Sequence, residues 1–109
     1  MTNLLQVHTT AGSADEATRI ADRLLEAKLA ACVQIHGPIR SRYWWQGKLE
    51  ESEEWVCTAK TLSDRYEAIE TAIRDVHSYE EPEILATNIE FGSPGYVEWV
   101  NATVGDDMA

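Results

Sequence analysis

The sequence predicts an α+β fold: a ferredoxin-like βαββαβ sandwich, in which one antiparallel sheet has two helices on one face. Three observations predict it. Apolar residues step by three and four along residues 14–28 and again along residues 62–76, as in amphipathic helices. Strand-like runs stand before, between and after these segments. The two runs in the middle are separated only by Gln46-Gly47, which is typical of a tight hairpin turn. We expect a single domain over residues 1–109.

The first strand is expected over residues 4–10, which combine Leu, Val and Thr. Ser13 and Glu16 then form a capping box, in which a hydroxyl and a carboxylate satisfy free N–H groups at the start of a helix. The helix over residues 14–28 follows from its apolar stripe of Ala17, Ile20, Ala21, Leu24 and Leu25.

A long hairpin is expected next, with strands over residues 31–45 and 49–61. Gly37-Pro38 interrupts the first of them. Because proline cannot donate a hydrogen bond to a central strand, this dipeptide predicts a bulge or an edge position.

The turn at Gln46-Gly47 also fixes a register for the hairpin. It pairs Cys57 with His36, and Cys32 with Thr61, unless the bulge shifts the strands. The cysteines are then too far apart for a disulfide. We expect both to remain free thiols.

The second helix is expected to begin near Leu62, with Thr61 or Ser63 as its cap, and to end at His77. A fourth strand over residues 84–91 completes the sheet. Ser93-Pro94 predicts the start of an extra C-terminal helix that ends at Gly105.

Composition excludes several classes of function. The chain has 19 acidic and 9 basic side chains and a net charge of −10, which disfavours nucleic acid and anionic membranes as partners. No apolar run approaches the ~20 residues of a membrane span. The N-terminus has no secretory signal pattern, so we expect a cytoplasmic protein.

Aromatic residues gather toward the distal half of the hairpin, at Tyr43, Trp44, Trp45 and Trp55. Large exposed aromatic patches on soluble proteins usually mark interfaces. We therefore expect the hairpin to contact a neighbouring subunit. The alternative is that the C-terminal helix covers these rings.

No catalytic motif is recognisable, and we expect no enzymatic activity. Metal ligation is the remaining chemistry, because imidazole and thiolate donors suit copper and zinc. None of the candidates has a diagnostic spacing, and each has a structural alternative, such as His77 capping a helix or Cys32 lying in a core. They are His8, His36, His77, Cys32 and Cys57.

Five motifs together resemble the CutA family of divalent-cation tolerance proteins, and they extend from the first helix to the last. They are Leu29-Ala30-Ala31-Cys32-Val33, Ser41-x-Tyr43-x-Trp45-x-Gly47-Lys48, Glu54 with Lys60-Thr61, His77-x-Tyr79-Glu80-x-Pro82-Glu83-Ile84, and Tyr96-x-x-Trp99.

The resemblance implies a homotrimer whose hairpins extend across subunits, a role in tolerance to divalent cations, and weak binding of a copper ion in which His77 takes part. It also implies an inter-subunit cleft. The cleft residues are Tyr43, Trp45, Glu54, Lys60, Tyr79, Glu83 and Trp99.

Two positions depart from the family pattern. Gln34 stands where asparagine is common, and Ser78 replaces a proline next to His77. Two other functions remain open: a PII-like sensor that binds a small molecule in the cleft, and an enzyme that uses Glu54, Lys60 or Glu83 in acid–base chemistry.

Overall fold

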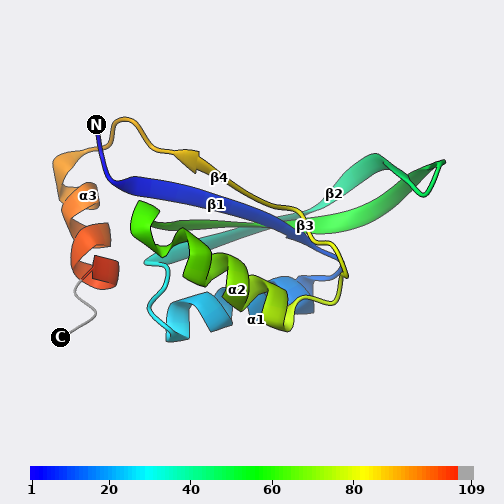
Figure 1. Cartoon of the computed structure of the whole chain (residues 1–109), viewed down its shortest axis with the longest axis horizontal. Helices are drawn as coiled ribbons and strands as arrows, with labels where there is room; N and C mark the ends of the chain where they lie inside the picture. The colour runs from blue at the N-terminus through cyan, green and yellow to red at the C-terminus, as the bar shows by residue number, and fades with distance from the viewer. Residues whose placement is uncertain (106–109) are drawn as a thin grey trace.

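The computed structural model describes residues 1–105 and contains one antiparallel four-stranded sheet in the order β2-β3-β1-β4. Helices α1 and α2 lie side by side under one face, and the β2-β3 hairpin extends well beyond them (Figure 1). This arrangement confirms the predicted ferredoxin-like α+β fold. The elements are β1 (Leu4–Ala11), α1 (Ala14–Glu26), β2 (Cys32–Trp45), β3 (Lys48–Leu62), the 3₁₀ turn η1 (Ser63–Arg65), α2 (Tyr66–Val76), β4 (Ile84–Asn88), α3 (Pro94–Val100) and the π turn η2 (Asn101–Gly105).

The Ser13 half of the predicted capping box is confirmed, because the Ser13 hydroxyl accepts a hydrogen bond from the Glu16 amide at 3.1 Å. The Glu16 carboxylate accepts from the Gly12 amide instead of the Ser13 amide. The expected apolar stripe is buried except for Leu25, which is 39% exposed. The helix ends at Glu26, two residues earlier than expected. Lys28 has a φ of 57°, outside the helical region, so the helix cannot include it.

The hairpin turn lies at Gln46 and Gly47, as predicted, and both residues have positive φ. Toward the tip the register follows the prediction, with Trp45 opposite Lys48. Between His36 and Ile39 it shifts, because the Gly37-Pro38 bulge adds a residue to β2.

The pairing expected for the cysteines is therefore wrong by one residue. Cys57 lies opposite Ile35 rather than His36, and Cys32 lies opposite Lys60 rather than Thr61. The two cysteines are not paired with each other across the strands, and both are free thiols, as predicted.

The main core lies between the sheet and helices α1 and α2. Its fully buried side chains include Val7, Ile20, Leu24, Ile69 and Ile73. Leu62 is not the first residue of the second helix, as expected, but the last of β3. The short η1 turn separates it from α2. Strand β4 ends at Asn88, short of the expected residue 91, because its partner β1 begins only at Leu4.

A second, smaller core lies on the opposite face of the sheet. Here α3 and η2 place Val100 and Val104 against Leu4 and Leu62. Figure 1 shows α3 at the end of the sheet away from the hairpin tip, so the alternative that it covers the hairpin aromatics is wrong. Trp44 accordingly remains 73% exposed. No helix in residues 1–105 is long and apolar enough to span a membrane.

Candidate functional site

A pocket of about 520 Å³ lies at the base of the hairpin, within the size range of small-molecule sites. One wall comes from the hairpin and the other from the loop that follows α2. Thr10 of β1 lies between them. The lining residues are Ser41, Arg42, Tyr43, Trp45 and Glu54 on the hairpin, and Tyr79, Glu80, Glu81 and Glu83 on the loop.

Glu54 joins the two walls and is only 7% exposed. The Ser41 hydroxyl donates to one of its oxygens at 2.7 Å, and the Tyr79 hydroxyl donates to the other at 2.8 Å. Burial, and then the hydrogen bond to Glu54, raise the pKa of the Tyr79 phenol, so Tyr79 stays protonated and remains a donor.

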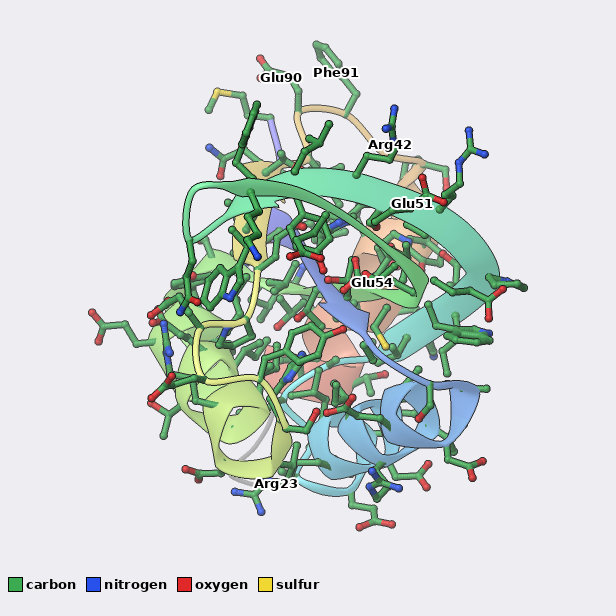
Figure 2. The ribbon with its side chains drawn as sticks, turned by 90° about the vertical axis from the view of Figure 1, so that its right-hand side faces the viewer. Arg23, Arg42, Glu51, Glu54, Glu90 and Phe91 are labelled. Atoms are coloured by element: carbon green, nitrogen blue, oxygen red, sulfur yellow. The ribbon has the colours of Figure 1, made fainter. Side chains whose placement is uncertain are left out.

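Around the pocket, the hairpin carries charge on both strands. Arg42 Nε lies 3.1 Å from Glu51 Oε1 across the strands. Figure 2 looks at the molecule from the hairpin end and shows Arg42 and Glu51 on the strands, with Glu54 deeper in the structure.

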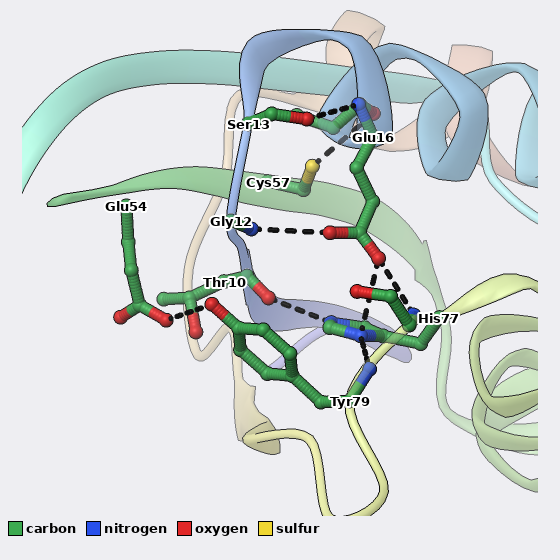
Figure 3. Close-up of polar contacts among 10 residues, drawn as sticks. Thr10, Gly12, Ser13, Glu16, Glu54, Cys57, His77 and Tyr79 are labelled. Atoms are coloured by element: carbon green, nitrogen blue, oxygen red, sulfur yellow. Dashed lines mark hydrogen bonds and ion pairs between the residues drawn. The ribbon is translucent and has the colours of Figure 1, made fainter. Parts of the chain in front are cut away.

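His77 lies behind the pocket, and its side chain is completely buried. Its Nε2 is 2.7 Å from the Thr10 carbonyl oxygen, and its Nδ1 is 3.1 Å from the Tyr79 amide nitrogen (Figure 3). A neutral ring with its proton on Nε2 satisfies both bonds, with Nε2 donating and Nδ1 accepting. Neither nitrogen is free for a metal ion in this arrangement. Ligation of copper by His77 stays a prediction, and it requires one of these bonds to open.

Glu16 is a buried charge beside His77. Its carboxylate accepts from the Gly12 amide at 3.1 Å and from the Ser78 amide at 2.7 Å. Burial opposes ionisation, but the hydrogen bonds from Ser78 and Gly12 outweigh it, so the pKa of Glu16 lies below its ordinary value.

The sequence predicts Glu16 only as a helix cap, and its contact with Ser78 was missed. One signal was present: Glu16 lies one turn before Ile20 and therefore on the buried face of α1.

The other candidate metal donors are dispersed. His8 Nε2 lies 3.1 Å from Glu83 Oε2, and these side chains are 38% and 46% exposed. Cys57 is buried, and burial together with the Glu16 charge raises the pKa of its thiol to about 11. Within residues 1–105, no three or more histidine, cysteine or acidic side chains are grouped closely enough to hold a metal ion.

One chain brings together five of the seven residues expected in the cleft, namely Tyr43, Trp45, Glu54, Tyr79 and Glu83. Lys60 shares a sheet face with Glu54 but lies six residues along β3, roughly 20 Å away. Its amine donates to the Gln34 side chain at 2.8 Å, so the two do not form an ion pair within the chain. Trp99 lies on α3, where its ring centroid is 5.5 Å from that of Tyr96.

Known proteins are similar to this chain in sequence and in overall fold. The family model described as CutA1 divalent ion tolerance protein matches residues 5–103. The divalent-cation tolerance protein CutA of Archaeoglobus fulgidus is 44% identical over 98 residues, which cover 90% of this chain and 95% of that protein.

Solved structures agree. The periplasmic divalent cation tolerance protein CutA from Archaeoglobus fulgidus superimposes with a TM-score of 0.90 at 42% identity, over 93% of this chain and 98% of that one. The divalent cation tolerance protein from Thermus thermophilus gives a TM-score of 0.91 at 33% identity, over 94% and 99%. The chain therefore belongs to the CutA1 divalent ion tolerance family.

Proposed function

We propose that this protein contributes to divalent-cation tolerance as a homotrimer that binds metal ions such as copper weakly and reversibly at the rim of the hairpin pocket. One observation carries the proposal: the exposed pair His8 and Glu83 adjoins the acidic loop wall formed with Glu80 and Glu81. The net charge of −10 adds a general attraction for cations.

The donor chemistry supports divalent transition metals. Imidazole nitrogen and carboxylate oxygen together suit copper and zinc. In the described part of the chain, two protein donors lie within reach of each other at this rim, so water or a neighbouring subunit supplies the remaining ligands. Such a site binds weakly and exchanges its metal readily. No catalytic step is part of the proposal.

The trimer rests on the hairpin. Strand β2 lies at the edge of the sheet, and Trp44, Trp45 and Leu49 near the hairpin tip are about half exposed or more. A long edge strand with exposed apolar side chains favours pairing with another chain. Sedimentation equilibrium at low micromolar concentration should give three times the chain mass of 12.2 kDa, and a monomer mass would contradict the assembly.

Calorimetric titration of copper into the sized oligomer tests the metal site. His8→Ala and Glu83→Gln should each weaken binding about tenfold, since each removes one of two donors. His36→Ala is the matched control, because it removes an exposed imidazole from β2 and should leave binding unchanged. Equal affinity in all four proteins would show that copper binds elsewhere.

Binding of a small molecule is the second candidate, favoured by the pocket's volume and by its three aromatic rings, Tyr43, Trp45 and Tyr79. A metabolite that raises the melting temperature in metal-free buffer would support it. We propose the cytoplasm as the compartment, where free thiols such as Cys32 and Cys57 stay reduced.

A further inference from the structure

We propose that Glu16 is a positioning residue for the pocket: its buried carboxylate holds the start of the loop after α2, so that Tyr79 reaches Glu54. The effect on metal binding rests on the proposed function. The positioning itself does not, because it concerns only contacts within the chain.

The loop needs such an anchor because the sheet does not supply one. Strand β4 pairs with β1 only from Leu5 to Thr9. At Thr10, the next residue along β1, the carbonyl oxygen bonds to the His77 ring instead of to a strand amide. The loop after α2, which forms the acidic wall of the pocket, therefore has no strand pairing that fixes its path.

Glu16 supplies the missing fixed point. One carboxylate oxygen accepts from Gly12 in the turn between β1 and α1, and the other accepts from Ser78 in the loop. The Ser78 bond is short, at 2.7 Å, as expected of an amide bonded to an ionised acceptor. Glu16 and Ser78 are 62 residues apart in sequence, so this side chain ties the loop to a distant segment of the chain.

The constraint passes directly to Tyr79, the residue after Ser78. The Tyr79 amide donates to His77 Nδ1, and the two rings pack with centroids 4.7 Å apart. On the far side, a side-chain atom added at Gly12 would lie only 3.2 Å from the Tyr79 hydroxyl. Tyr79 is therefore held from both sides, with its hydroxyl directed at Glu54 (Figure 3).

Glu16→Gln tests the proposal, because it preserves shape but replaces one acceptor oxygen by an NH₂ donor. That donor must face either the Gly12 or the Ser78 amide. Three changes are expected. The NMR signals of these two amide protons move upfield. The ring proton signals of Tyr79 shift in the same spectra. Copper affinity falls about threefold to tenfold.

Ser13→Ala is the matched control. It removes the hydroxyl that accepts from the Glu16 amide at the same helix end but leaves the carboxylate contacts intact. The Ser78 amide signal and the Tyr79 ring signals should stay as in the wild type. If Ser13→Ala changes them as much as Glu16→Gln does, the effect is a general loosening of the helix end, and the proposal fails.

The proposal also fails if Glu16→Gln folds but leaves the Ser78 and Tyr79 signals unchanged. If the Glu16→Gln variant does not fold, a Glu54→Gln variant is acidified instead. In that variant, residue 54 no longer titrates beside Tyr79. Protonation of Glu16 should then move the Ser78 amide and Tyr79 ring signals with one midpoint, and a Tyr79 signal that does not follow Ser78 overturns the inference. Altered Tyr79 signals with unchanged copper affinity would support the positioning role and contradict the metal site at the pocket.

Discussion

Replacing Gly37 by alanine should destabilise the protein strongly, because the bulge presses this residue against Trp55. A methyl group at Gly37 would lie 2.6 Å from Trp55 Cδ1, 2.8 Å from Cγ and 3.0 Å from Cα. These atoms belong to the root of the indole and to the backbone of β3, so none can swing aside. Overpacking usually costs about 1–3 kcal/mol, and we expect the upper half of that range, about 2–3 kcal/mol.

Guanidinium unfolding measures this change, provided that the chain concentration is held fixed, since assembly adds to the apparent stability. Gly95→Ala is the matched control. Within residues 1–105, no atom outside its own helix backbone and chain neighbours lies within 4 Å of the added methyl group. Because Gly95 is helical, alanine should stabilise the protein by up to ~1 kcal/mol. If Gly37→Ala lies within about 0.5 kcal/mol of the wild type, the contact with Trp55 does not constrain the bulge.

Three further predictions follow from buried groups. Thr9 Oγ1 is buried without a hydrogen-bond partner among residues 1–105. Thr9→Val should therefore raise the free energy of unfolding, measured in urea, by about 1 kcal/mol. A loss of stability would mean that the hydroxyl has a hydrogen-bond partner. At about pH 8, alkylation followed by mass spectrometry should label Cys32 in the native protein but Cys57, whose pKa is raised to about 11, only after unfolding. Equal labelling rates would contradict the burial of Cys57. The pKa of Glu16 is lowered from 4.5 in the folded state, so the ionised carboxylate stabilises the fold above about pH 4.5. This stabilisation is lost as the pH falls through the lower pKa of the folded state. The difference in unfolding free energy between wild type and Glu16→Gln should therefore shrink as the pH falls from about 6 to about 3, and a constant difference would contradict it.

Local patterns predicted the order of the elements well. The stripe of α1, its cap at Ser13 and the turn at Gln46-Gly47 depend on neighbours within a few residues, and each lies where the sequence placed it. The register of the hairpin could be predicted only as far as Ile39. Beyond the Gly37-Pro38 bulge, the sequence pattern does not say by how many residues the pairing shifts.

The site was predictable where it depends on strand pairing. Tyr43 and Trp45 are two residues apart in β2, so their side chains lie on the same face of the hairpin, which is also the face of Glu54. The proximity of these three residues therefore follows from the strand pairing. The contacts of His77 with Thr10, and of Glu16 with Ser78, join segments that are more than 60 residues apart. Only the folded chain could reveal that these two residues support the pocket from behind.

The two cores lie on opposite faces of one sheet, and this separation has a consequence for amide hydrogen exchange. The small core beneath α3 rests on Leu4 and Leu62, whereas the main core is built from α1, α2 and the central strands. Helix α3 can thus detach while the main core stays closed. Its amide protons should exchange through a local opening of low free energy, and those of β1 and β3 should exchange only when the whole domain unfolds. The C-terminal segment is, in this sense, a separate cooperative unit attached to a more durable sheet.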